Sequence, residues 1–253
     1  MPQITVATLN LRNRSDRWRR RRHLLVAQLL DVLPNLISLQ EISFPIGQGR
    51  WIRNQINARL PEGKRPYRLI QIRKQHPVNG YLEGIGVLCN LPILYSDSLN
   101  LGFGGRVALR VNVELDNRQP LDFVATHFHH VAEEKEARQE QALMLTGWLA
   151  DKRPLPAQVI AGDFNELPSG PAIQIMKQRF RSAYQLRHGY EPLATFPTAL
   201  LPLGEWAGCL DYIFVSSAIH HVPQATIFCD VPALDDDTLY PSDHVGLLAA
   251  LEI

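Results

Sequence analysis

The stretch AGDFNELP, residues 161–168, decides how the rest of this sequence is interpreted. It follows the apolar residues Val159 and Ile160, which predict a short buried strand ending at Asp163. Asn165 comes two residues later, so a carboxylate and a carboxamide follow the same strand. Because layered α/β proteins build their sites in the loops at strand ends, this stretch predicts a functional loop.

The chain on either side repeats this arrangement of a strand followed by polar side chains. Polar residues stand at the ends of successive predicted strands: Asn10, Glu41, His127, Asp163 with Asn165, Asp211, and Asp243 with His244. One such residue alone would be interpreted as part of a turn or as a helix cap. Their recurrence favours one site that is assembled from several loops.

Apolar periodicity predicts alternating strands and helices. The expected strands are residues 4–9, 36–39, 67–74, 84–89, 106–115, 121–126, 159–161, 212–215 and 245–251. The expected helices run from a cap at Ser15 or Asp16 to Leu33, and over residues 51–60, 133–149 and 172–178. No low-complexity linker or repeat interrupts the pattern, so residues 1–253 are expected to form one α/β domain with mixed sheets.

The composition is that of a globular protein without a membrane anchor. Of its 253 residues 45% are hydrophobic and 20% are charged, which suffices for a sizeable core. No run of about 18 apolar residues predicts a membrane span, and the first residues do not resemble a signal peptide. Three scattered cysteines indicate neither a disulfide framework nor a zinc–thiolate site. We expect a cytoplasmic protein that does not insert stably into membranes.

Positive charge gathers in the first third of the chain. Residues 1–75 hold 15 Lys and Arg against 4 Asp and Glu, whereas residues 76–253 hold 11 against 21. The run RWRRRRHLL, residues 17–25, is predicted to open a helix, not to form a free arm or a targeting signal. Helical spacing places Arg22 on the apolar face, where a charge needs a partner, so Arg22 is expected to be ion-paired.

Six short motifs, in order, resemble the hallmark motifs of the endonuclease/exonuclease/phosphatase superfamily. They are ATLN (7–10), SLQE (38–41), ATHF (125–128), AGDFNELP (161–168), LDYIF (210–214) and YPSDH (240–244). The resemblance implies a four-layer α/β sandwich, in which two mixed β-sheets pack face to face and helices flank them. It also implies a site at one edge, where strand-end loops of both sheets meet.

The resemblance further implies a metal centre for phosphate-ester hydrolysis. Glu41 matches the family's principal metal ligand, and Asn10 and Asp243 match its neighbours. The expected ion is Mg²⁺, with Mn²⁺ as the alternative, because a hard cation prefers oxygen ligands. A second metal position nearer Asp163 and Asn165 stays open.

The other motif residues are expected to handle protons and phosphate. Asp211 matches a carboxylate that orients His244, and Asp163 matches one placed beside the attacking water. Whether Asp163 or the Asp211–His244 pair is the general base stays open. Asn165 is expected to donate a hydrogen bond to the phosphate or the nucleophile, and His127 to face the phosphate or the leaving oxygen.

Several other side chains are assigned around this centre. The candidate substrate contacts are Arg12, Arg14, Arg17, Tyr81 and Arg106. His129 and His130 are expected to be solvated loop residues. The run Gly102–Arg106 is interpreted as a turn, and the acidic run Asp235–Asp237 as a solvated loop.

The leading hypothesis is a Mg²⁺-dependent phosphoesterase, and within that class a nuclease acting on nucleic acid. The basic first third favours it, because exposed Lys and Arg attract a phosphate backbone. The alternative is a phosphatase or phosphodiesterase acting on a small phosphorylated metabolite or a lipid head group. A catalytically silent binding module is disfavoured because every motif position is filled. Substrate choice stays open, because loops outside the motifs, such as 186–208 and 230–240, set it. DNA against RNA, endo- against exonuclease action and oligomeric state stay open as well.

Overall fold

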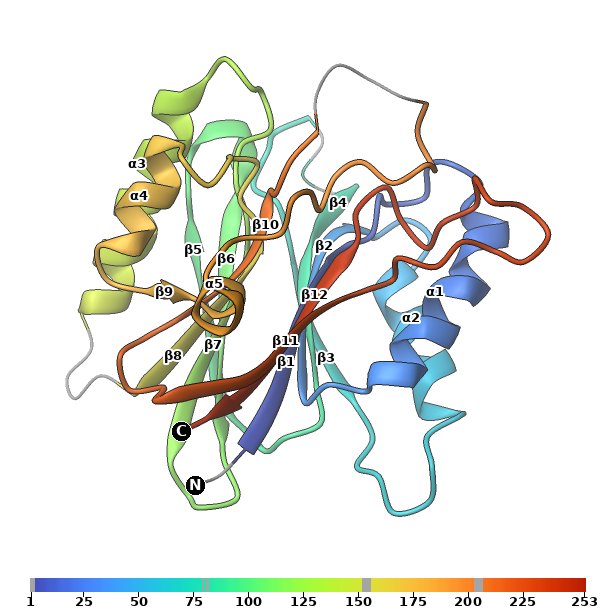
Figure 1. The fold of residues 1–253 in the computed structure, drawn as a ribbon, viewed down its shortest axis with the longest axis horizontal. Helices are drawn as coiled ribbons and strands as arrows, with labels where there is room; N and C mark the ends of the chain where they lie inside the picture. Colours follow the sequence, from blue (N-terminus) through green and yellow to red (C-terminus); the bar gives the residue numbers. More distant parts are fainter. Residues whose placement is uncertain (1–2, 79, 81, 152–155, 203–206) are drawn as a thin grey trace.

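Two six-stranded sheets pack face to face, with helices on their outer faces (Figure 1). This computed structural model describes residues 3–78, 80, 82–151, 156–202 and 207–253. Both sheets contain parallel and antiparallel pairs, so the predicted four-layer sandwich of mixed sheets is confirmed.

The first sheet has the strand order β11-β12-β1-β2-β4-β3. Its strands are β11 (His221–Phe228), β12 (Gly246–Glu252), β1 (Gln3–Asn10), β2 (Leu36–Ser43), β4 (Glu83–Cys89) and β3 (Arg68–Arg73). The second sheet has the order β5-β6-β7-β8-β10-β9. Its strands are β5 (Ile93–Asn100), β6 (Val107–Glu114), β7 (Pro120–His127), β8 (Ala157–Asp163), β10 (Asp211–Val215) and β9 (Arg181–Ser182).

The two sheets share one pattern of strand directions. Each has a single central parallel pair, β1–β2 or β7–β8, and antiparallel pairs on both sides. A parallel pair needs a crossover connection. Helix α1 (Trp18–Val32) connects β1 to β2, and helix α3 (Lys135–Ala150) connects β7 to β8. The carboxyl ends of these four strands therefore supply the loops of one molecular edge.

Three apolar layers hold the sandwich together. Between the sheets lie residues such as Val111 and Phe123, both fully buried. Helices α1 and α2 (Gln48–Asn57) pack on the first sheet through residues such as Leu25 and Ile52. Helices α3 and α4 (Pro171–Lys177) cover the second sheet, where Leu145 is buried. Helix α5 (Ala183–His188) lies against β10 and β11. Among the described residues, none of the helices has the length and apolarity that crossing a membrane requires.

The expected strands and the four expected helices are confirmed, but the details at helix starts differ. Neither Ser15 nor Asp16 caps α1, which begins at Trp18 after Arg17 in a left-handed conformation (φ 61°). Helix α2 begins at Gln48, three residues before the expected start. The strands β5, β9 and β11 and the helix α5 were not expected.

The prediction for the arginine run was wrong about which arginine is buried. Arg21, not Arg22, is fully buried. Within the described part of the chain Arg22 makes no ion pair, and its guanidinium lies 4.8 Å from the centre of the Trp51 ring. Side chains on a helix lean toward its N-terminus, so Arg21 reaches the loop that precedes α1. That loop offers carbonyl groups, which the spacing of apolar residues does not reveal.

Arg21 connects two loops at this edge of the molecule, the loop before α1 and the loop that contains Pro241. Its guanidinium donates hydrogen bonds to six backbone carbonyls, those of Leu11, Arg12, Asn13, Ser15, Asp16 and Pro241. Burial lowers its pKa to about 10. Arg138 occupies the equivalent fourth position of α3, is also buried, and donates to the carbonyls of Val131 and Ala132 and to Glu166. Each crossover loop is thus held by a buried arginine.

Candidate active site

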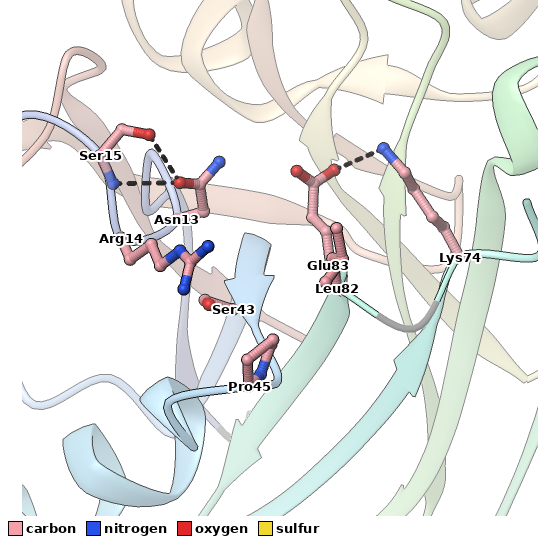
Figure 2. Close-up of a pocket in the computed structure, with 8 residues that line it drawn as sticks. All are labelled: Asn13, Arg14, Ser15, Ser43, Pro45, Lys74, Leu82 and Glu83. Carbon is pink, nitrogen blue, oxygen red and sulfur yellow. Dashed lines mark hydrogen bonds and ion pairs between the residues drawn. The ribbon is translucent and has the colours of Figure 1, made fainter. Parts of the chain in front are cut away.

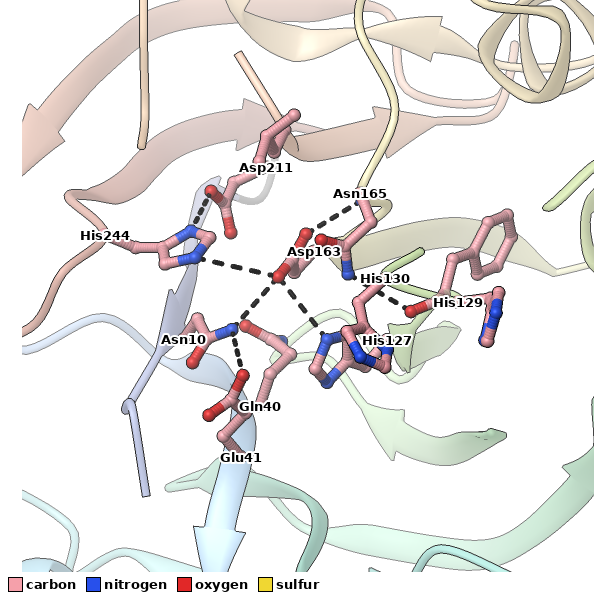
Figure 3. Close-up of polar contacts among 12 residues, drawn as sticks. Asn10, Gln40, Glu41, His127, His129, His130, Asp163, Asn165, Asp211 and His244 are labelled. Carbon is pink, nitrogen blue, oxygen red and sulfur yellow. Dashed lines mark hydrogen bonds and ion pairs between the residues drawn. The ribbon is translucent and has the colours of Figure 1, made fainter. Parts of the chain in front are cut away.

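The predicted site residues meet where the two parallel pairs end (Figure 3). Asn10 is the last residue of β1, and Glu41 lies in the adjacent β2. His127 and Asp163 end β7 and β8 and are directly paired across these strands. The sheet topology therefore brings residues far apart in the sequence into hydrogen-bonding distance, such as Asn10 and Asp163, which are 153 positions apart.

One carboxylate oxygen is the point on which the site converges. Oδ2 of Asp163 accepts from Asn10 Nδ2 at 3.0 Å, and it lies 3.5 Å from His127 Nε2 and 3.9 Å from His244 Nε2. The other oxygen, Oδ1, accepts from the backbone N–H of Asn165 at 2.8 Å. Burial, together with the nearby charge of Asp211, raises the pKa of Asp163 to about 7.

Glu41 is placed by an irregularity in β2. The register between β2 and β4 shifts between Leu39 and Ile42, and Glu41 has a left-handed backbone (φ 52°). A β-bulge of this kind redirects a side chain. Oε1 of Glu41 accepts from Asn10 Nδ2 at 3.3 Å, and Oε2 accepts from Asn13 Nδ2 at 3.3 Å. Burial and the charges of Glu83 and Asp243 raise the pKa of Glu41.

Asp243 brings a second carboxylate close to Glu41 and Asn10. It is buried, and its Oδ2 lies 3.3 Å from Arg12 Nε. The preceding Ser242 donates from Oγ to the carbonyl of Asn10 at 2.6 Å, which ties this loop to the end of β1.

His244 and Asp211 form a buried, hydrogen-bonded pair. Nδ1 of His244 donates to Asp211 Oδ2 at 2.8 Å, and the ring of Phe196 lies 4.9 Å from the imidazole, centre to centre. Burial alone would lower the pKa of His244. The charge of Asp211, its hydrogen bond, and the charge of Asp163 outweigh burial and raise this pKa to about 10. His244 is therefore an imidazolium at neutral pH, with its Nε2–H directed at Asp163.

His127 is the opposite case, a neutral imidazole. Burial and the charge of Arg106 lower its pKa well below the ordinary value. Arg106 Nη1 lies 2.8 Å from Nδ1 of His127. The site thus contains one charged and one neutral histidine, both of which face the same carboxylate.

A cavity of about 370 Å³ opens over this cluster. Its lining includes all the predicted catalytic and metal-ligating residues except Asn10 and Asp211, which are buried. Seven further residues line it: Arg12, Asn13, Lys74, Glu83, Arg106, His130 and Phe196. A second cavity of about 330 Å³ adjoins it and shares Asn13, Lys74 and Glu83 with it (Figure 2). Arg14 and Pro45 lie on the far side of that second cavity.

The five predicted substrate contacts have different outcomes. Arg12 lines the main cavity but is paired with Asp16 and Asp243. Arg14 is exposed and lines the adjoining cavity. Arg17 lines neither cavity and instead pairs with the acidic loop. Tyr81 lies outside the described residues. Arg106 lines the main cavity, where its guanidinium contacts His127.

The acidic run is therefore not a free solvated loop. Asp236 pairs with Arg17 at 2.9 Å and with Arg20 at 3.2 Å, and Asp235 lies 3.5 Å from Arg20. The charge asymmetry of the sequence is partly neutralised here, because the acidic end of the chain folds against the basic first helix.

The two histidines after His127 differ from each other. His129 is buried, its Nε2 lies 2.7 Å from Glu134, and the expectation that it is solvated was wrong. His130 is exposed, as expected, but it lines the main cavity and its Nδ1 lies 3.2 Å from Arg106 Nη2. The sequence interpretation missed the cavity residues Asn13, Lys74, Glu83 and Phe196. Their signal was weak, since they stand in loops or at the start of a strand and belong to none of the six motifs.

Two groups of side chains offer metal ligands. Glu41, Asp243 and Asn10 supply the hard oxygen atoms that Mg²⁺ prefers. Among the described residues, Asp163, Asp211 and His244 also place one potential ligand atom each within 4.8 Å of one another. However, a protonated imidazole is not a metal ligand, and His244 Nδ1 is already bound to Asp211. The first group fits a magnesium ion better.

Comparison with known proteins identifies the family. A model of the endonuclease/exonuclease/phosphatase family matches residues 7–244. The chain belongs to this family. Its members are nucleases and phosphatases, so it is placed among phosphoester hydrolases. No curated protein matches the sequence closely enough to be reported as a relative.

Solved structures of very different sequence share the fold. The human Nocturnin catalytic domain with bound sulfate is 19% identical in sequence and has a TM-score of 0.79. The match covers 99% of this chain and 93% of the Nocturnin chain. Humanized TDP2 of D. rerio is 15% identical with a TM-score of 0.79, covering 99% of both chains. The mannosyl-6-phosphatase Bt3783 of Bacteroides thetaiotaomicron is 20% identical with a TM-score of 0.77, covering 99% of this chain and 100% of its own.

Proposed function

We propose that this protein is a Mg²⁺-dependent phosphoesterase that hydrolyses phosphodiester bonds, and that its substrate is a nucleic acid. The observation that carries the proposal is the convergence of Asn10, His127 and His244 on one oxygen of Asp163. The cavity above this cluster also contains the carboxylates of Glu41 and Asp243. Such a site can bind a metal ion, a phosphate and a water molecule side by side.

Glu41, Asp243 and Asn10 would hold the cation, with Mn²⁺ as a substitute for Mg²⁺. The bound cation would supply neutralisation of charge on the phosphoryl oxygens. Asn10 also separates the carboxylates, since its amide donates to both Glu41 and Asp163. The pair Arg12–Asp243 must loosen for Asp243 to act as a ligand, which would leave Arg12 available to a phosphate oxygen.

The remaining side chains divide the proton chemistry between them. Asp163 would accept the proton of the attacking water, because His244 already carries its own proton below a pKa of about 10. The imidazolium of His244, held by Asp211, would bind a phosphoryl oxygen through Nε2–H. Neutral His127 would donate a hydrogen bond to the phosphate or the leaving oxygen. Asn165 would donate a further one, although its amide now contacts the carbonyl of Phe128.

The adjoining cavities favour a polymeric substrate. A chain bound with one phosphate over Asp163 can extend past Lys74 to Arg14. A small phosphorylated metabolite or lipid head group is the second candidate. The observation in its favour is that Arg17 and Arg20 are paired internally and Arg21 is buried, which removes cations that a polynucleotide would need.

The test is hydrolysis of single- and double-stranded DNA, RNA, and small phosphomonoesters and phosphodiesters, with Mg²⁺ or with EDTA. We expect metal-dependent cleavage of a polynucleotide, falling steeply as the salt concentration rises. Cleavage of only small substrates, with weak salt dependence, would select the second candidate. No turnover of any substrate with metal would reject both.

The proposal extends to the whole chain and its location. We infer a single catalytic domain over residues 1–253 and a cytoplasmic protein. The three cysteines, Cys89, Cys209 and Cys229, are all free and buried, which suits a reducing compartment.

A further inference from the structure

Arg106 lies behind His127 as seen from Asp163. Its Nη1 is 2.8 Å from His127 Nδ1, and on the other side of the same ring Nε2 is 3.5 Å from Asp163 Oδ2. Arg106 is 5% exposed. Its position on the imidazole's far side suits a residue that acts through His127.

The chemistry of the two groups fixes the hydrogen on the imidazole. A guanidinium has five N–H donors and no acceptor. Nδ1 of His127 must therefore accept, and a neutral imidazole that accepts at Nδ1 carries its hydrogen on Nε2. That hydrogen is directed at Asp163 and at the cavity in which a phosphate would bind. The other tautomer would present a lone pair to the carboxylate and to any phosphate oxygen.

The surroundings hold Arg106 in this position. Glu83 Oε1 lies 3.9 Å from Nη1 of Arg106 and 2.8 Å from Lys74 Nζ. Lys74, Glu83 and Arg106 thus form a row of alternating charges. The turn before Arg106 contains Gly104 and Gly105, both with positive φ. A Cβ on Gly105 would come within 2.6 Å of the backbone of Gln75. Only glycine allows this close approach, which brings Arg106 beside the end of β3.

We infer that Arg106 is a positioning residue that sets the Nε2–H tautomer of His127, so that this histidine serves the site as a neutral hydrogen-bond donor. Arg106 Nη2 imposes the same tautomer on His130, whose Nδ1 lies 3.2 Å away. The inference replaces the expectation that Arg106 touches the substrate directly. Its kinetic consequence rests on the proposed function, but the tautomer does not.

The direct test is nitrogen-15 NMR of the histidine rings in the full-length protein, without metal or substrate. The signals of His127 are assigned by their loss in His127→Asn. We expect Nδ1 to give the resonance of an unprotonated nitrogen and Nε2 that of a protonated one at neutral pH. A wild-type protein with the hydrogen on Nδ1 overturns the inference, whatever the enzyme's activity.

Variants of Arg106 separate positioning from substrate binding. Arg106→Met is expected to give mixed or reversed tautomers at His127 and to lower kcat roughly 10- to 100-fold, with little change in KM. Arg106→Lys keeps one donor and should retain part of both properties. Arg110→Met is the matched control, since it removes a second buried arginine, which lies on β6 and contacts Asp97 and Trp148. It should leave the tautomer and kcat unchanged.

A double-mutant cycle completes the test. If Arg106 acts through His127, Arg106→Met should cause no further loss of kcat in a His127→Asn background. A full additional loss, or a rise in KM with kcat unchanged in the single variant, would overturn the inference in favour of direct substrate contact. If Arg106→Met does not fold, the wild-type spectrum and Arg106→Lys still decide the question. If no substrate is turned over at all, the proposed function fails and the tautomer is judged by NMR alone.

Discussion

Asp163 and Asp211 lie directly opposite each other on the antiparallel strands β8 and β10. Two carboxylates in this relationship repel each other. The imidazole of His244 compensates, since Nδ1 is 2.8 Å from Asp211 and Nε2 is 3.9 Å from Asp163. The protonation of each of these three residues therefore depends on that of the other two. Together they determine how the protein responds to pH.

Stability of the metal-free protein should fall as the pH rises. Folding raises the pKa of Asp163 from 3.8 to about 7 and that of His244 from 6.5 to about 10. In both cases the folded state holds its proton more tightly than the unfolded state. The stabilisation is complete below the unfolded pKa and lost as the pH passes the folded one, with a slope of at most about 1.4 kcal/mol per pH unit for each group.

Urea denaturation with EDTA at several pH values measures this effect. The free energy of unfolding should decrease between pH 7 and 9.5 in the wild type, where His244 is the responding group. His244→Gln should flatten that decrease. A wild-type protein that becomes more stable over this interval would contradict the assignment of His244 as an imidazolium.

Asp211→Asn should lower activity without unfolding the protein. The amide removes the negative charge that raises the pKa of His244, so the imidazolium is lost at neutral pH. We expect kcat to fall by roughly 10² or more and the alkaline limb of the pH profile to move to lower pH. Asp116→Asn, on an exposed side chain, is the control that should change neither. An unchanged pH profile in Asp211→Asn would show that the pair does not act as described.

Metal should stabilise the protein more at pH 8 than at pH 5.5. The pKa of Glu41 is raised by burial and by Glu83 and Asp243, so protons compete with the cation at low pH. The measurement is the shift in Tm on adding Mg²⁺ or Mn²⁺ at both pH values. Glu41→Gln should abolish the shift and the activity, whereas Glu114→Gln on β6 should retain both. A full shift in Glu41→Gln would place the metal elsewhere, for example at Asp163, Asp211 and His244.

Arg21→Met should strongly destabilise the protein, although Arg21 has no proposed role in catalysis. Six carbonyl groups would lose their donor, and leaving buried acceptors unpaired costs about 1–3 kcal/mol each where water cannot replace the bond. We expect a loss of roughly 3 kcal/mol or more in urea denaturation. Arg19→Met, on the exposed side of the same helix, should change stability by less than about 0.5 kcal/mol. Equal effects would refute the role given to Arg21.

The sequence predicted the central strands well because they are buried on both faces. Strands β7 and β8 are nearly continuous apolar runs that end at a polar residue, and this pattern can be recognised in the sequence alone. The missed strands β5, β9 and β11 all lie at edges of their sheets. Edge strands tolerate polar residues and proline, as in the sequences ILYSDSLN and HVPQATIF, so their periodicity is weak.

Within the site, the ordered motifs predicted which residues would meet but not their charge states. Asp243 and Glu41 were expected beside each other, and the structure brings them together around Asn10. The pairing of Arg106 with His127, and of Arg17 with Asp236, depends on side-chain directions that no local pattern encodes. For the same reason the helical wheel selected Arg22 in place of Arg21, since it follows Cα positions and not the reach of the guanidinium.

The carboxamide of Asn10 links the two sheets. Its Nδ2 donates to Glu41 on the first sheet and to Asp163 on the second, at 3.3 and 3.0 Å. The opening between the two halves of the sandwich is thus matched to the length of one short side chain. A shift of one sheet against the other, from repacking deep in the interior far from any charged group, would break one of these bonds. The packing of the apolar layer between the sheets therefore sets the distance between the metal-binding and proton-accepting sides of the cleft.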